Sequence, residues 1–308
     1  MISRRNIRVK VMQTIYAAEN MEPAWNEQQA LSVLEKHLDA TRQLFTYLVY
    51  FLTEVARYAE RDARQRASKH LPTSGDLNVN TRIAGNELLW QIIEDQEFTS
   101  ACSQYKTSLL CDQDLVRKTY QLLAETPEYK RYIELPSRER KEERKIIEFI
   151  FTNLMLPEDR FTSHVEELFL QWDDDAEMMQ QMMLNFLQKP ATYHFSELVS
   201  REKLDFARRL VATVIGKKDF CMELIIPRLK NWDAERIAVL DMILMRMGIC
   251  EFLYFETIPA KVTLNEYIDL AKDYSTPQSG HFVNGILDNI HKELLSEDKL
   301  QKVDYKKQ

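Results

Sequence analysis

Signals for turns and strands are scarce in this chain. Its 308 residues include only six glycines and nine prolines, and no segment alternates apolar and polar residues over the length of a strand. Such alternation is the pattern of a half-buried β-strand, and glycine and proline mark the turns that join strands. The composition therefore predicts an all-α protein built as a helical bundle.

Long apolar runs are absent as well. No stretch approaches the roughly 18–20 residues that a transmembrane helix needs. The first residues, MISRRNIRVKVM, lack the apolar segment and small-residue cleavage site of a signal peptide. We therefore expect a cytoplasmic protein that has no membrane partner.

The short motifs of catalytic and metal sites are also missing. The four cysteines form no CxxC pair, and the six glycines lie too far apart for a phosphate-binding loop. HExxH, ExxH and GxSxG do not occur, and the six histidines are scattered. The sequence therefore predicts a non-enzyme without metal or cofactor. A metal-dependent site within 80–200 is the least favoured alternative.

Positive charge is concentrated near the start of the chain. The net charge is −7, so a nucleic-acid contact would have to come from a local patch. An amphipathic helix is predicted over 3–20, and its cations Arg4, Arg5, Arg8 and Lys10 precede the first acidic residue. Its inner face should be formed by Ile7, Val11, Thr14, Ile15 and Ala18.

One side of this first helix suits single-stranded RNA. Helical geometry places Arg5, Arg8, Met12 and Tyr16 along that side. Cations neutralise phosphates, and an aromatic ring stacks on an unpaired base. The alternative is an ordinary solvated N-terminal helix, because short basic clusters are common.

The C-terminal third predicts three consecutive helices. The first, over 233–254, is apolar on nearly all sides and should be a buried central helix. The second should begin at Thr263, which fits a capping box with Glu266. The third should follow the Ser-Thr-Pro sequence at 275–277, with a hydroxyl N-cap and the proline in the first turn. Within it, Gly285 is expected to mark close packing between helices.

The middle of the chain also predicts helices. One long helix should cover 26–70, with an apolar seam that packs against other helices. After a break, shorter helices are predicted over 80–96, 112–125, 137–156, 157–172, 174–188 and 196–215. Asp112 and Ser137 should be N-caps, and Pro127 and Pro157 should lie in first turns. The four methionines between 178 and 183 should fill a core.

Three segments resemble the family of the transcription antitermination factor NusB. VTLNEYIDLAK at 262–272 is similar to that family's V-A-I-N-E-A-I-E-L-A-K, and FVNGILD at 282–288 is similar to F-V-N-G-V-L-D. RRNIRVKVMQTIY at 4–16 is similar to R-R-x-A-R-x-x-A-x-Q-A-L-Y. Cys250 stands where the family often has an aromatic residue. Matching blocks in the same order at both ends of the chain make the resemblance specific.

The resemblance implies a fold and a division of the chain. The fold would be a NusB-like bundle of two helical subdomains with an additional all-α central insertion. The expected parts are the N-terminal helices at 1–70, the insertion at 71–199, the C-terminal helices at 200–295 and a frayed tail at 296–308.

The resemblance also implies an RNA-binding transcription antitermination factor. Such a factor would bind boxA-type single-stranded RNA of rRNA transcripts with the ribosomal protein NusE, inside an antitermination complex with RNA polymerase. The first-helix cations and the matched positions give the expected RNA contacts: Arg4, Arg5, Arg8, Lys10, Tyr16, Lys272, Ser279 and Phe282. Glu251 and Asn284 are expected on the partner side, with Asn284 also suited to fixing a turn.

A second function remains open at this stage. The same helices would serve a scaffold or adaptor that binds proteins and not RNA. Homo-oligomerisation, the preferred RNA sequence, the affinity for the partner and the role of 71–200 are left open by the residue pattern.

Overall fold

The computed structural model describes residues 2–229 and 237–303, and these residues form helices and turns without a β-strand. The all-α prediction is confirmed for this part of the chain. The helices group into two compact units. We call 2–38 together with the described residues from 199 onward the terminal unit, and 39–198 the insertion unit.

One helix belongs to both units. α2 (Glu27–Ala67) is a single helix of 41 residues, close to the predicted 26–70. Its residues up to Leu38 belong to the terminal unit, and Asp39 begins the insertion unit. The boundary between the two units therefore falls inside a helix, whereas the division that the resemblance implied lies after residue 70.

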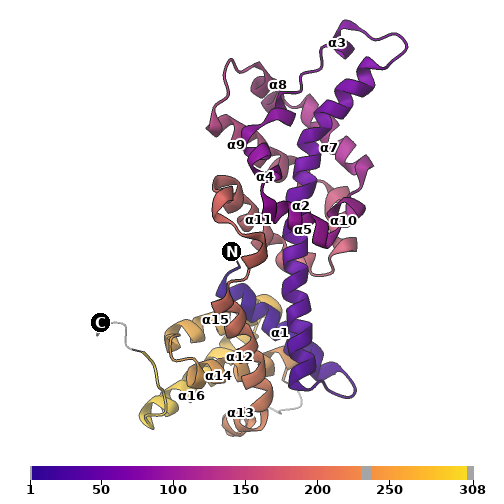
Figure 1. The fold of residues 1–308 in the computed structure, drawn as a ribbon. Helices are drawn as coiled ribbons and strands as arrows, with labels where there is room; N and C mark the ends of the chain where they lie inside the picture. The colour runs from indigo at the N-terminus through magenta and orange to yellow at the C-terminus, as the bar shows by residue number, and fades with distance from the viewer. Residues whose placement is uncertain (1, 230–236, 304–308) are drawn as a thin grey trace. The chain divides into compact units, whose positions relative to one another are not determined.

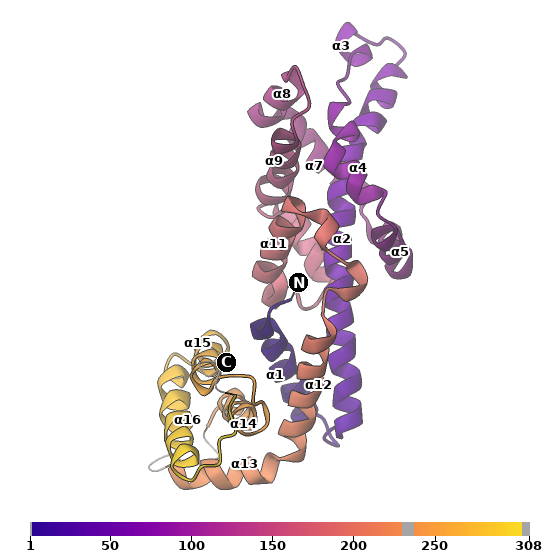
Figure 2. The same cartoon turned by 60° about the vertical axis from the view of Figure 1, so that its left-hand side comes forward.

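The terminal unit is a bundle around α14 (Figures 1 and 2). Its other helices are α1 (Arg4–Asn20), α12 (Arg201–Gly216), α13 (Lys218–Ile225), the 3₁₀ turn η5 (Ile226–Arg228), α15 (Ala260–Tyr274) and α16 (Ser279–Ser296). α14 (Val239–Tyr254) contacts α1, α12, α13, α15 and α16. Figure 2 shows it in the midst of these five helices.

Burial on all sides makes α14 the core of the terminal unit. Every residue from Ile243 to Phe252 is buried, which confirms the predicted central helix. The predicted start of this helix at 233 lies outside the described residues. A Cβ atom on Gly248 would come within 2.9 Å of a Leu287 methyl and 3.4 Å of the Tyr267 ring. Glycine at 248 therefore allows α15 and α16 to pack closely against α14.

Two helix starts differ from the prediction. α15 begins at Ala260, with Pro259 as its N-cap, so the expected capping box is wrong. Thr263 lies inside the helix and donates its hydroxyl hydrogen to Glu251 instead. α16 begins at Ser279 with Gln278 as N-cap, and the Ser-Thr-Pro sequence forms the preceding turn. A tertiary contact therefore takes up the Thr263 side chain, while the hydroxyls of Ser275 and Thr276 bond locally to the Ser279 hydroxyl.

Gly285 also differs from its expected role. It lies on the exposed side of α16, and a Cβ atom there would meet no neighbour within 4 Å. The expectation of close helix packing at this position is therefore wrong. The glycine at 248, within the apolar helix, has that role instead.

The two ends of the terminal unit are both docked. α1 buries the inner face predicted for it, from Ile7 to Ala18. After α16 the chain turns through Asp298, whose φ is 54°, and crosses to the end of α14. There the Lys302 ammonium donates to the carbonyls of Glu251 and Phe255, each at 2.8 Å. The predicted fraying of 296–308 is therefore not seen in its described part.

The insertion unit consists of short helices beside the remainder of α2. They are α3 (Ser74–Leu77), η1 (Arg82–Gly85), α4 (Glu87–Ile93), α5 (Gln96–Tyr105), α6 (Thr107–Leu110), α7 (Gln113–Glu125), α8 (Pro127–Glu134), α9 (Arg140–Phe149), the π-helix η2 (Ile150–Met155), α10 (Asp159–Leu168), α11 (Trp172–Gln188), η3 (Pro190–Thr192) and η4 (Phe195–Glu197). Met178, Met179, Met182 and Met183 are buried in α11, as predicted for core methionines.

Two of the four helix starts predicted in the insertion unit are confirmed. Asp112 caps α7, and Pro127 lies in the first turn of α8. Ser137 is not the N-cap of α9, because that helix begins at Arg140 with Glu139 as its N-cap. Pro157 lies in a turn before α10, which begins at Asp159.

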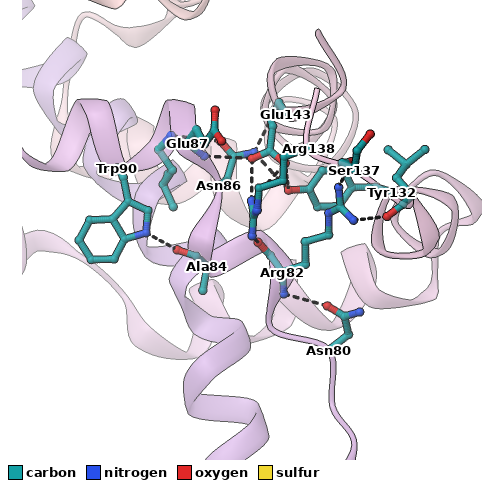
Figure 3. Close-up of polar contacts among 12 residues, drawn as sticks. Asn80, Arg82, Ala84, Asn86, Glu87, Trp90, Tyr132, Ser137, Arg138 and Glu143 are labelled. Atoms are coloured by element: carbon teal, nitrogen blue, oxygen red, sulfur yellow. Dashed lines mark hydrogen bonds and ion pairs between the residues drawn. The ribbon is translucent and has the colours of Figure 1, made fainter. Parts of the chain in front are cut away.

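Figure 3 shows why Ser137 is not a helix cap. The Arg82 guanidinium donates to the backbone carbonyls of Leu135 and Ser137 and holds the bend between α8 and α9 in place. Arg138 donates to the Arg82 carbonyl at 3.1 Å and to both oxygens of Glu143 at 3.0 and 3.2 Å. Two arginines therefore tie the segment before α4 to the segment before α9.

Candidate nucleic-acid interface

The first turn of α1 presents two of the expected cations. Ser3 caps the helix by accepting a hydrogen bond from the Asn6 amide. Arg4 pairs with Glu202, and the Arg5 guanidinium lies 2.6 Å from an oxygen of Asp273. Both arginines are partly exposed. Exposed ion pairs are worth only about 0–1 kcal/mol, so a phosphate can replace these carboxylates.

Arg8, one turn further along α1, lies in the interior. Only 2% of its side chain is exposed. Its guanidinium donates twice to Glu251, at 2.8 and 2.9 Å, and once to Glu266, at 3.2 Å. Burial opposes the charge, but these carboxylates outweigh it and raise the pKa of Arg8 above its usual value. The expectation that Arg8 faces RNA does not fit this placement.

Glu251 is the buried centre to which Arg8 is bound. Thr263 and Tyr267 of α15 donate their hydroxyl hydrogens to its two oxygens, at 2.7 and 3.0 Å. Burial, and next the charge of Glu251, raise the pKa of Tyr267 well above its usual value. The carboxylate therefore joins α1, α14 and α15, and its side chain is not available to a partner protein.

Two further residues of α1 are buried: Lys10, which was an expected RNA contact, and Met12, which lies on the predicted RNA side. Lys10 and Met12 are each about as buried as Arg8. Burial and the nearby charge of Lys10 lower the pKa of His37. Lys10 therefore acts in the interior of the terminal unit and is not placed to contact a nucleic acid.

The last residue of the predicted stripe, Tyr16, returns to the surface. Its side chain is 44% exposed, and its backbone carbonyl accepts from the Asn20 side chain at 2.8 Å. The stripe therefore has exposed ends at Arg5 and Tyr16 and a buried middle. The ring of Tyr16 can present a face to an unpaired base.

The end of α15 supplies a third exposed cation. Lys272 has 58% of its side chain exposed, and its ammonium lies 3.2 Å from Asp269. Its aliphatic part passes over Gly280 of α16, where an added Cβ atom would lie only 2.7 Å from the Lys272 Cγ. The absence of a side chain at 280 therefore fixes the course of Lys272 across the α15–α16 turn.

The start of α16 exposes fewer of the expected RNA-contact residues than predicted. Ser279 is buried, and its hydroxyl donates to Asp241 at 2.7 Å, which joins α16 to α14. Phe282 is half-buried and lines a cavity of about 180 Å³ together with Asp241 and Gln278. Asn284 is also half-buried. Ser279 therefore has a structural role, while part of the Phe282 side chain remains accessible to solvent.

Three of these residues lie around one turn of the terminal unit. Arg5 contacts Asp273, which is next to Lys272, and Phe282 lines its cavity with residues 276 and 278 of the same turn. The structure thus brings Arg5, Lys272 and Phe282 to the α15–α16 turn from segments more than 250 residues apart in sequence. Arg8, Lys10, Ser279 and Glu251 are buried instead.

Comparison with known proteins identifies the family of this chain. A family model described as the NusB family matches residues 165–292. A curated relative from Methylacidiphilum infernorum, named transcription antitermination protein NusB, is 31% identical over 140 residues, which cover 45% of this chain and 93% of that protein. The chain belongs to the NusB family. The relationship includes nearly the whole length of this relative, so it extends beyond the short motifs at 262–272 and 282–288.

Other NusB relatives match over shorter segments. The proteins of the same name from Finegoldia magna and Salinibacter ruber are 36% and 42% identical over 94 and 98 residues. These matches cover 69% and 61% of the relatives and about a third of this chain. A solved structure of T. maritima NusB matches 46% of this chain at 28% identity, with a TM-score of 0.31.

One strong contact of this NusB-family chain was not predicted. The buried Arg246 donates to both oxygens of Glu19 at 2.6 and 2.7 Å, and Lys218 pairs with Glu19 at 3.0 Å. Burial acts to raise the pKa of Glu19, but bonding to Arg246 outweighs it and lowers the pKa. The sequence did contain a signal for this contact. Arg246 is a lone arginine in an apolar helix, and a buried charge of this kind needs a charged partner.

The described residues contain neither a membrane-spanning helix nor a cluster of metal-ligating side chains. No helix among residues 2–229 and 237–303 is both long and apolar enough to span a bilayer. Within the same residues, no three His, Cys, Asp or Glu side chains are grouped so that they could hold a metal ion.

Proposed function

We propose that this NusB-family chain is an RNA-binding transcription antitermination factor. It would bind boxA-type single-stranded RNA of rRNA transcripts together with the ribosomal protein NusE, and would carry out no catalytic step. The observation that carries the proposal is the family relationship over 93% of a relative named for antitermination. Binding to nascent transcripts places the protein in the cytoplasm, within a complex that contains RNA polymerase.

The proposed RNA contacts are the exposed residues of the terminal unit. Arg4, Arg5 and Lys272 would bind phosphates, and Tyr16 and the exposed part of Phe282 would contact bases. The present carboxylate partners of the cations are themselves exposed, so the exchange for phosphate costs little. Arg8 and Glu251 would act indirectly, by fixing α1 against α14 and α15.

The partner protein would supply much of the affinity. The net charge of the chain is −7, so attraction to RNA is confined to this local set of cations. A basic ribosomal protein beside the set would add phosphate contacts and favour the complex. Of the two residues expected on the partner side, Asn284 keeps partial exposure and remains a proposed contact, while the Glu251 side chain is buried.

A binding titration tests the proposal. Fluorescence anisotropy of a boxA RNA should show weak binding by the chain alone and tighter binding when NusE is present. Three or four phosphate contacts predict a log–log salt slope of about −2 to −3. The variant Arg5→Glu/Lys272→Glu removes two phosphate contacts, so it should weaken RNA binding by roughly tenfold or more and flatten this slope by about 1.4.

A matched control separates a local contact from a general charge effect. Lys292 is an exposed lysine of α16 that pairs with Asp288, much as Lys272 pairs with Asp269. The control Lys292→Glu reverses one charge, so it is compared with the single variant Lys272→Glu and not with the double variant. Only Lys272→Glu should weaken RNA binding. Equal losses, or an affinity independent of NusE and salt, would contradict the proposal. Assembly with proteins but not with RNA would favour the scaffold or adaptor function.

A further inference from the structure

Two cysteines of the terminal unit lie side by side in its core. The sulfur of Cys221 in α13 is 3.6 Å from the sulfur of Cys250 in α14, and both residues are fully buried. The two cysteines are 29 residues apart in sequence and form no CxxC motif, so the sequence did not predict their contact. A contact of this length leaves the two thiols unbonded but places each within reach of the other.

The surroundings of the pair carry positive charge. The Arg246 carbonyl lies 4.0 Å from the Cys221 sulfur, and the Arg246 guanidinium is held nearby by Glu19. Donation from the Cys250 thiol lowers the pKa of Cys221, although burial opposes it, and the charge of Arg246 lowers it further. The pKa of Cys250 is raised by the same contact and by burial. Cys221 is thus the member of the pair that ionises first.

We propose that Cys221 and Cys250 form a redox-active dithiol that a hydroperoxide converts into a disulfide, which covalently joins α13 to α14. The thiolate of Cys221 attacks one peroxide oxygen and breaks the O–O bond, which gives a sulfenic acid and releases an alcohol or water. The Cys250 sulfur then attacks the sulfenic sulfur, and its proton leaves with the hydroxyl group as water. Overall, two thiols and one hydroperoxide give one disulfide, one alcohol or water, and one further water.

Access to the buried pair is provided by α13. This helix has only eight residues, and Lys218 and Phe220 in it are exposed, as is the preceding Lys217. A short helix with few buried residues opens locally more readily than the core helix α14. Opening exposes Cys221, and reclosing returns it to Cys250.

The other two cysteines provide internal controls. Both belong to the insertion unit, and burial raises the pKa of Cys102 to about 11 and that of Cys111 to about 12. Such thiols are poor nucleophiles at neutral pH. Cys102 is nevertheless the most accessible of the four. If exposure decided which cysteine is oxidised, Cys102 would react first. If the distance between sulfurs decides, the Cys221–Cys250 pair reacts.

The test treats the full chain with hydrogen peroxide and follows it by intact mass and peptide mapping. The proposal expects a loss of two hydrogens, a crosslink between the peptides of Cys221 and Cys250, and full reversal by dithiothreitol. The variant Cys102→Ala/Cys111→Ala should react in the same way. The crosslink closes a loop of about 30 residues, so the melting temperature should rise by roughly 5–10 °C on oxidation.

A second probe does not depend on oxidation. Phenylarsine oxide bridges two thiols that lie close together, so it should bind the Cys102→Ala/Cys111→Ala variant with a stoichiometry of one. Cys221→Ala in that background should abolish both the crosslink and arsenical binding. Separate oxidation of the two sulfurs to sulfinic acids would overturn the proposal, as would a disulfide through Cys102 or Cys111 in the full chain. Two thiols still titratable in the Cys102→Ala/Cys111→Ala variant after peroxide treatment would overturn it as well.

Discussion

Each unit buries one glutamate beside a tyrosine and an arginine, but the two arginines are placed differently. In the terminal unit Glu251 is bound by Arg8, which is 2% exposed, and by Tyr267. In the insertion unit Glu143 is bound by Arg138, which is 35% exposed, and by Tyr132 at 2.9 Å. The same chemistry therefore joins core helices in one unit and holds a surface segment in the other.

The two units also differ in charge. The insertion unit contains 19 Lys and Arg against 27 Asp and Glu, a net charge of −8. The rest of the chain contains the remaining 22 and 21, a net charge of +1. The acidity of the whole protein thus comes from the insertion unit. The residues proposed to contact RNA all lie in the terminal unit, where the charge does not oppose them.

The largest expected effect is the loss of the fully buried arginine. Arg8→Met removes the guanidinium that donates twice to Glu251 and leaves this buried carboxylate with the neutral donors Thr263 and Tyr267. Breaking such a pair costs about 3–5 kcal/mol, so the urea midpoint of the terminal unit should fall strongly. Adding Glu251→Gln should recover part of the loss. An unchanged midpoint would show that the pair contributes nothing to stability.

Packing around α14 predicts the next effect. Gly248→Ala places a methyl group 2.9 Å from Leu287, which is itself buried. Overpacking of this kind costs about 1–3 kcal/mol. The loss should appear as faster hydrogen exchange in α14 and α16, with the insertion unit unaffected. Exchange that increases equally in both units would contradict a local packing role.

The exposed counterpart of Arg8 should matter less. Arg138→Met removes one ligand of Glu143, which still accepts from the Tyr132 hydroxyl and from the Glu87 amide at 2.9 Å. Solvent screening of the exposed guanidinium reduces the cost to about 1–2 kcal/mol. Hydrogen exchange in α4 and α9 would measure it. A cost as large as that of Arg8→Met would remove the distinction between the two clusters.

Acid should weaken the terminal unit through Glu19. Its pKa is lower in the folded chain than in the unfolded chain, so the folded state is stabilised while the carboxyl is ionised. That stabilisation is complete above the unfolded pKa and is lost as the pH falls through the folded value. Glu19→Gln should therefore flatten the decrease of melting temperature below about pH 4.5. An acid profile identical to that of the parent chain would contradict this assignment.

The smallest effect should be a gain. Gly285→Ala adds a methyl group on the exposed side of α16, where no atom lies within 4 Å. Alanine favours a helix interior over glycine by about 0.5–1 kcal/mol. Thermal melting of Gly285→Ala beside Gly248→Ala should therefore show opposite signs for the same substitution. A loss at both positions would mean that α16 has a neighbour at Gly285 in solution.

The local pattern was sufficient for much of the fold. The 3.6-residue periodicity predicted α1 and α2 nearly to their ends, and the apolar run before Pro259 predicted the buried α14. Local rules were misleading where a side chain had a stronger distant partner. Thr263 fits a cap in sequence, but its hydroxyl bonds to Glu251 from inside the helix. Ser279 was expected to contact RNA, but its buried hydroxyl bonds to Asp241.

The candidate interface shows the same division. Helical spacing put Arg5, Arg8 and Tyr16 on one side of α1, and all three lie along that side in order. The residue spacing does not predict which part of this side of α1 is covered by another helix. α14 and α15 cover the middle, so Arg8 became a structural residue while Arg5 and Tyr16 stayed exposed.

The sequence by itself determined that this chain is helical, that α14 is its buried centre, and that it resembles the NusB family, because periodicity and motifs are properties of neighbouring residues. Only the tertiary structure decided which charged residues are buried, that Cys221 meets Cys250, and that the cations of both chain ends share one turn. Those outcomes depend on contacts between residues distant in sequence, and such contacts exist only once the helices have packed.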